Sequence, residues 1–210
     1  MSASESRSRL YSRFGTYMAF PTARVWQESL RRNTFTLLES ADRGLPYAFC
    51  PGTSGIEGSY TLDDLEQAFT VNFDTGAAAV SFHGRSYTND GDQKLFEELF
   101  RFYEHFGLDF SSSNNDFWPD SLQIELEFMH YLTYLEGLAG DNRNAIMKAQ
   151  RDFLTRHLRP LLAGVNASLV EKNIPIYTQL ATLLNEFVEA DCAYLNEVIG
   201  DQIPVRQIAL

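Results

Sequence analysis

The sequence predicts an all-α protein, a single-domain helical bundle with a long central loop. Apolar and aromatic residues recur at spacings of three and four along most of the chain, which is typical of amphipathic helices. No long stretch alternates with period two, so no strands are required. With 210 residues, 44% of them hydrophobic, the chain can bury a core without disulfides. We therefore expect one domain over residues 1–210, with flexible ends at about 1–7 and 201–210.

Three helices are expected in the first third of the chain, over residues 6–20, 23–42 and 61–73. The second should stop at "RGLP", because Gly44 and Pro46 are common helix terminators. The third begins with Thr61, followed three residues later by Asp64, which is the spacing of a capping box. Leu65 and Phe69 then place an apolar stripe on one face of that helix.

A glycine-dotted segment, residues 74–92, separates these helices from the rest of the chain. Long loops in compact domains often carry function, so this loop is a candidate binding element. Four further helices are expected after it, over residues 93–106, 119–139, 142–162 and 169–199. The sequence "AGVN", residues 163–166, is interpreted as the break between the last two.

Charge and cysteine usage narrow the classes of partner. The net charge of −11 repels phosphate backbones, so no nucleic acid is expected as a partner. Such a charge favours a basic partner, such as an arginine-containing peptide, although it also simply keeps a protein soluble. Cys50 and Cys192 form no CxxC pair, which favours the reducing cytoplasm. No apolar run reaches the roughly 18 residues that span a bilayer, so stable membrane insertion is not expected.

The stretch "DFWPDSLQIELEFMHYL", residues 116–132, invites a catalytic or metal-binding interpretation. Glu127 and His130 form one Glu-x-x-His motif, whereas a di-iron bundle needs two of them. Glu125 and Glu127 point roughly 200° apart on a helix, so they cannot act as a carboxylate pair. Asp120 also suits a plain helix-end role, because an acid there complements the helix dipole.

Other chemical motifs are missing from the sequence. It contains no GxxxxGK[ST] loop, no HExxH and no GxSxG. We therefore predict no catalytic residue, no metal and no cofactor. An acidic, aromatic-rich helical chain of this kind is typical of a peptide-binding module, in which aromatic side chains bury apolar anchors and rim acids select basic ones.

The same stretch resembles the signature of the TorD/DmsD/NarJ family of molybdoenzyme assembly chaperones. Pro119 and Asp120 match its Pro-Asp-His segment, and Ser121 stands where the family has histidine. The matching helix positions that follow are Leu122, Glu125, Leu126, Glu127, Phe128 and Met129. "DFLTRHLRPLL" and "LEQAFTVNFDTG" are similar to further family segments. "FRFYEHFGLDF" and "HGRSY" look most like the subgroup serving type II enzymes of the DMSO reductase family.

This resemblance implies a non-catalytic cytoplasmic chaperone. Such proteins bind the catalytic subunit of a molybdenum oxidoreductase at or near its twin-arginine signal peptide, and assist insertion of the molybdenum cofactor before export. The family implies a monomer or a helix-swapped dimer. Two alternatives remain, a helical scaffold subunit of a redox complex and a GTP-binding maturation switch. The lack of a P-loop argues against the switch.

The peptide-binding residues expected on this basis are of two kinds. Aromatic side chains would bury the apolar part of the partner, and acids would pair with its guanidinium groups. The full set is Phe69, Phe73, Phe82, Tyr87, Asp116, Trp118, Pro119, Asp120, Ser121 and Glu125. Each aromatic residue is also compatible with an ordinary core position.

Overall fold

The structure is a computed structural model that describes residues 2–39, 43–49, 55–74, 79–89, 91–109 and 118–200. Within these ranges the chain is helical, and its only β-type pairings are two isolated bridges, Thr34 with Gly55 and His83 with Ser121. The predicted all-α fold is confirmed. None of the described helices is both long enough and apolar enough to cross a bilayer.

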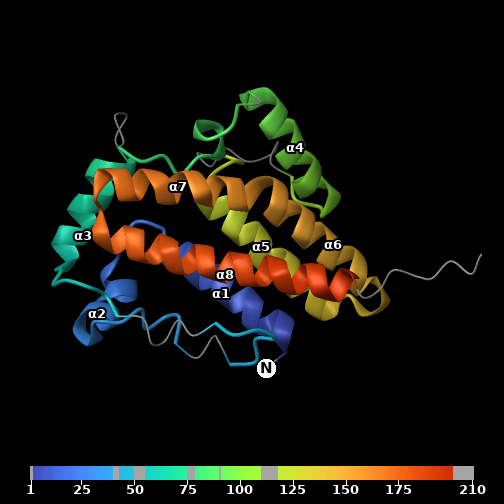
Figure 1. Cartoon of the computed structure of the whole chain (residues 1–210), viewed down its shortest axis with the longest axis horizontal. Coiled ribbons are helices and arrows are strands. Elements are labelled where there is room, and N and C mark those ends of the chain that lie inside the picture. Colours follow the sequence, from blue (N-terminus) through green and yellow to red (C-terminus); the bar gives the residue numbers. More distant parts are fainter. Residues whose placement is uncertain are drawn as a thin grey trace, which may run out of the picture.

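Five helices form the body of the molecule. Figure 1 shows α7 (Arg159–Lys172) and α8 (Pro175–Gly200) running side by side across the front, with α1 (Ala3–Tyr17) and α5 (Leu122–Leu138) behind them and α6 (Arg143–Phe153) at one end. The densest packing is between α1 and α5. Their facing apolar side chains, such as Leu10, Phe14 and Leu126, are fully buried, and this burial drives association of the helices.

In the described part of the range 1–7, which the sequence analysis expects to be flexible, the chain is helical from Ala3. Helix α1 begins at Ala3, and the hydroxyl of Ser2 caps it by accepting a hydrogen bond from the Glu5 amide at 3.2 Å. Arg7 is fully buried and forms ion pairs with α5 and α8. These long-range contacts hold the first helical turns in place, which no local pattern in the sequence could reveal.

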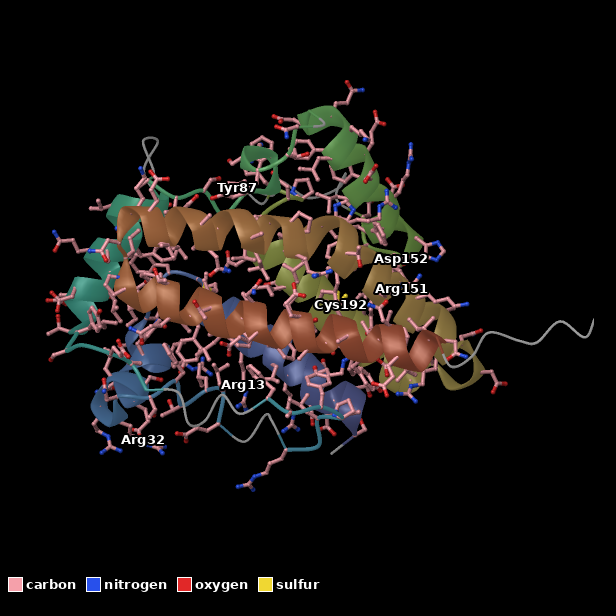
Figure 2. All side chains as sticks on the ribbon, in the orientation of Figure 1. Arg13, Arg32, Tyr87, Arg151, Asp152 and Cys192 are labelled. Carbon is pink, nitrogen blue, oxygen red and sulfur yellow. The ribbon has the colours of Figure 1, made fainter. Side chains whose placement is uncertain are left out.

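Helix α2 (Ala23–Arg32) is ten residues shorter than the expected 23–42. It ends because Asn33 adopts a left-handed conformation, with φ of 50°, at the C-terminal cap. The chain then folds back as turns. Arg13 of α1 donates hydrogen bonds to the carbonyls of Leu37 and Glu39 and so fixes these turns against the bundle (Figure 2).

Helix α3 (Leu62–Phe69) begins as predicted with a capping box. The Thr61 hydroxyl accepts from the Asp64 amide at 3.2 Å, and the Asp64 carboxylate accepts from the Thr61 amide at 2.8 Å. A single π-helical turn, Thr70–Asp74, follows directly and carries Phe73. Such turns often mark functional sites, because the extra residue re-aims side chains.

The expected break at residues 163–166 is also wrong. Helix α6 continues through a π-helical segment, Leu154–Leu158, into α7, and the chain turns instead at Asn173, which has φ of 53°. Gly164 lies within α7 beneath the Tyr87 ring, where an added Cβ would be only 2.3 Å from ring atoms. Figure 2 shows Tyr87 above α7. Glycine therefore serves close packing here and does not end a helix.

The segment of residues 79–89, which we call the strap, crosses the start of α5. The Leu122 amide donates to the Phe82 carbonyl, and the Gly84 amide donates to the Asp120 carbonyl, both at 2.8 Å. Helix α5 starts three residues later than the expected Pro119, because Ser121 is its N-cap and accepts from the Ile124 amide at 3.3 Å. After the strap, α4 (Asp92–His105) packs on the upper side of the bundle (Figure 1).

Candidate functional site

An aromatic groove of about 450 Å³ opens where the end of α1, the π-helical turn after α3, the strap and the start of α5 meet. It brings together half of the predicted site, namely Phe69, Phe73, Phe82, Trp118 and Ser121. These residues are far apart in the sequence, so the groove exists only because the strap docks on α5.

The wall of the aromatic groove is a cluster of rings. Phe73 and Phe82 stack with their centroids 4.4 Å apart, and Tyr177 of α8 meets Phe73 edge-on at 4.8 Å. Phe20 and Trp118 at the rim are 46% and 50% exposed. Large, half-exposed aromatic side chains beside a groove mark a surface that gains free energy by binding an apolar partner.

Sequence reasoning missed two kinds of groove residue. Met18 and Phe20 line it just beyond the end of α1, within the range 6–20 that was expected to be helical. The signal that the sequence offers is an aromatic residue, Phe20, directly before a proline. The other kind is polar, and includes His83, Gln123 and the exposed Asp74. Asp74 is thus an acid that reaches the groove, whereas Asp120 and Glu125, the two predicted acids that the structure describes, do not line it.

Asp120 is fully buried behind the groove and is already paired inside the chain. One carboxylate oxygen accepts from the Arg85 amide at 3.0 Å and lies 3.3 Å from the Arg85 Nε, and the other lies 3.3 Å from Nδ1 of His83. Burial by itself would raise the pKa of Asp120, but these hydrogen bonds and charges outweigh it and lower the pKa. Asp120 is therefore an ionised internal anchor for the strap.

The side chain of Arg85 covers this carboxylate. Its guanidinium lies 4.1 Å from the centroid of the Trp118 ring and 5.4 Å from that of Phe96 on α4. The two rings are themselves roughly parallel, at 29°, with centroids 6.2 Å apart. We call the arrangement of Trp118, Phe96 and Asp120 around this guanidinium the arginine slot. It adjoins the aromatic groove, because Trp118 belongs to both.

Glu125 is buried in the first turn of α5, and its Oε2 has no hydrogen-bond partner among the described residues. Burial, together with the charge of nearby Asp120, raises the pKa of Glu125 well above its usual range. Burial therefore favours the neutral, protonated form of the Glu125 carboxyl group. Pro119, also buried, accepts a hydrogen bond from the Tyr103 hydroxyl at 2.7 Å through its carbonyl.

Of the two remaining predicted residues, Tyr87 does not line the groove and Asp116 is not described. The Tyr87 hydroxyl donates to the Ser81 carbonyl at 2.8 Å, and its ring packs on Gly164, so Tyr87 fastens the strap to α7. Asp116 lies outside the described residues.

His130, part of the Glu-x-x-His motif, has Nδ1 2.7 Å from the Ser8 hydroxyl and so joins α5 to α1. Among the described residues, no group of three acidic, histidine or cysteine side chains could hold a metal.

Comparison with known proteins places these features in a family context. Residues 20–165 match the family model described as nitrate reductase delta subunit. The chain is 32% identical over 200 residues, 88% of each protein, to a perchlorate reductase assembly chaperone protein of Dechloromonas aromatica (strain RCB). It is 34% identical to a selenate reductase assembly chaperone protein of Thauera selenatis, over 68% of this chain and 76% of that one. A chlorate reductase assembly chaperone protein of Ideonella dechloratans is 32% identical over 67% of this chain and 72% of its own.

Proposed function

Because the chain belongs to the nitrate reductase delta subunit family, we propose that it is a non-catalytic assembly chaperone for a molybdenum oxidoreductase of the DMSO reductase family. It binds the catalytic subunit in the cytoplasm, at or near the twin-arginine signal peptide, and assists insertion of the molybdenum cofactor before export. The observation that carries this proposal is the aromatic groove with its half-exposed rim, Phe20 and Trp118.

The groove suits an apolar helical segment with a basic end. Each large apolar side chain that leaves water in the groove contributes about 1.5–3 kcal/mol, so a few anchors suffice for selective binding. Asp74 at the groove and the net charge of −11 attract basic residues beside that apolar segment. A signal segment that combines an arginine pair with an apolar stretch has this chemistry.

The experiment that tests this function is capture of the client. The full chain is co-expressed with each DMSO-reductase-family catalytic subunit of the source organism, and complexes are purified through this chain. We expect one subunit to bind in its cofactor-free form and the loaded enzyme to be released. Retention in the mature, loaded enzyme would contradict the chaperone role and indicate the scaffold-subunit alternative.

The aromatic groove is tested in the same assay by the double variant Phe20→Ser, Trp118→Ala. Both side chains are half exposed, so their loss should leave the fold intact, while capture should weaken at least about tenfold, or 1.4 kcal/mol. The matched control is Leu138→Ser, which removes a 67% exposed apolar side chain at the end of α5, outside the groove lining. Equal capture by both proteins would show that the groove is not the binding surface.

A further inference from the structure

We propose that Arg85 is an internal occupant of a guanidinium-binding slot, and that an arginine of the bound segment displaces it. This inference rests on the proposed function, because it specifies how the chaperone recognises the basic end of its partner. It also changes the role expected for Asp120. The Asp120 carboxylate is not open to a partner, because Arg85 of the same chain already covers it.

The arginine slot has the chemistry of a guanidinium site. A flat cation lies over the face of Trp118 at 4.1 Å and near that of Phe96, and a fully buried carboxylate meets its edge. Guanidinium groups stack on aromatic faces and pair with carboxylates in one plane, whereas a lysine ammonium is a strongly hydrated point charge. The slot therefore selects arginine over lysine.

Arg85 is the accessible member of this arrangement. Its side chain is 23% exposed, whereas the side chain of Asp120 is fully buried. Its guanidinium also lies 3.3 Å from Nδ1 of His83, a residue that lines the aromatic groove. A segment bound in the groove therefore passes beside the slot, where Trp118 forms part of both sites. An incoming arginine can replace Arg85 while the carboxylate stays covered.

The strap does not depend on the Arg85 side chain for its attachment. The Arg85 amide still donates to Asp120 at 3.0 Å, and two backbone hydrogen bonds of 2.8 Å join the strap to the start of α5. The Tyr87 ring holds its far end on α7. Displacement of one side chain thus leaves the backbone of the groove in place.

The exchange gives specificity more than affinity. Replacing one guanidinium by another leaves the number of slot contacts unchanged, so the apolar groove supplies most of the binding free energy. A lysine or glutamine in the same position cannot take over the stacked, paired geometry. Arg85 then keeps the slot, and the basic end of the wrong partner stays in water.

The test uses the variant Arg85→Ala and methylguanidinium as the probe, below denaturing concentrations and at constant ionic strength. Removal of Arg85 leaves Asp120 buried beside an empty slot, so methylguanidinium should raise the Tm of the variant by about 3–6 °C once its concentration exceeds its Kd tenfold. Methylammonium should not. Wild type and the control Arg101→Ala, which loses an exposed arginine of α4, should show no rise. If Arg85→Ala does not fold, Arg85→Gln takes its place.

Two results would overturn the proposal. One is the same response of Arg85→Ala and Arg101→Ala to methylguanidinium. The other is a response that persists when Asp120→Asn is added, because rescue must then arise outside the slot. Since this measurement needs no client, its failure leaves capture by the groove untouched, and failure of capture leaves the slot result standing.

Peptide binding supplies a second readout. A leucine-rich helical peptide with an adjacent arginine pair should bind Arg85→Ala about tenfold more tightly than wild type, because its internal competitor is gone. The same peptide with lysines should gain nothing. Weaker binding of the arginine peptide to Arg85→Ala would mean that Arg85 only supports the strap, and would overturn the proposal.

Discussion

Two arginine–carboxylate clusters in this protein differ in how completely they are closed. Arg7 of α1 is fully buried and reaches Asp191 of α8, Glu136 of α5 and Gln150 of α6 at once. Among the described carboxylates Arg85 of the strap reaches only Asp120, and it keeps part of its side chain in solvent. Both clusters pair a guanidinium group with carboxylates, but we infer that they serve different roles.

The Arg7 cluster leaves no role for a ligand. Tyr11 and Tyr47 donate to the Asp191 carboxylate at 2.7 and 2.8 Å, and Arg143 donates to Glu136 at 2.8 Å. Burial alone would lower the pKa of Arg7, but the charges of Asp191 and Glu136 outweigh it and raise that pKa. A buried network whose polar groups are all paired specifies one arrangement of its helices.

The arginine slot is incomplete by the same standard. The guanidinium of Arg85 faces partly into water, and the neighbouring Glu125, in the first turn of α5, has a buried oxygen without a partner among the described residues. The difference teaches that a closed cluster fastens helices, whereas an open cluster beside a groove retains the capacity to exchange a partner. Three substitutions test the Arg7 cluster, the surroundings of Asp120 and the attachment of the strap, in order of expected effect.

The largest effect is expected for Arg7→Met. Removing the cation leaves Asp191 and Glu136 buried without their counter-charge, which should lower the free energy of unfolding by about 3–5 kcal/mol. Urea denaturation measures this loss. Arg9→Met, which removes an arginine in an exposed pair with Glu5 on the same helix, should cost less than about 1 kcal/mol. Similar losses in the two variants would mean that the Arg7 cluster does not fasten α1.

Glu125→Gln should have an intermediate effect that depends on pH. The folded pKa of Glu125 lies above its unfolded value, because burial and then the charge of Asp120 disfavour the ionised form. As pH rises above about 4.5, the unfolded chain therefore releases this proton before the folded protein does. The free energy of unfolding of wild type then falls by up to about 1.4 kcal/mol for each pH unit until the folded pKa is reached. Glu125→Gln should not show this fall, because glutamine has no carboxyl group to ionise.

Urea denaturation at pH 4 and pH 8 checks the prediction for Glu125. The two proteins should be similar at pH 4, and the variant should be the more stable at pH 8. Asp120, with its lowered pKa, has the opposite sign and loses its contribution only as pH falls below its unfolded value. A constant difference between wild type and Glu125→Gln across this range would show that the pKa of Glu125 is not raised in the folded state.

The smallest effect is expected for Gly164→Ala, which tests the attachment of the strap apart from the slot. The added methyl group would meet the Tyr87 ring, and overpacking of this kind costs about 1–3 kcal/mol, partly offset by the higher helix propensity of alanine. Thermal unfolding measures the change. In a Tyr87→Ala background the same substitution should become neutral or stabilising, and an unchanged cost there would disprove the contact.

Much of the fold could be predicted because its signals are local. The capping box at Thr61 and the apolar stripes each act within a few residues, and the corresponding helices are present. The errors arose where local signals compete with packing. Helix α2 ends early at Asn33, and the break predicted at residues 163–166 is absent because Gly164 packs against Tyr87, which is far away in the sequence.

The candidate site was predictable in composition but not in arrangement. Five of the ten expected residues meet in the aromatic groove, since the family signature and the aromatic content already marked them. Tyr87, Asp120 and Glu125 instead support the site from behind. The sequence alone cannot say that Asp120 is covered by Arg85, because that depends on the strap crossing α5.

By itself, the sequence determined the all-α class, most helix positions, the acidic character and the family. These properties follow from side-chain periodicity, capping and charge, which each residue carries wherever the chain places it. Only the tertiary structure decided which acids are exposed to solvent and which are buried and paired with groups of the same chain. Burial and pairing depend on the groups that distant segments bring close, and Asp120, Glu125 and Asp191 differ for this reason alone.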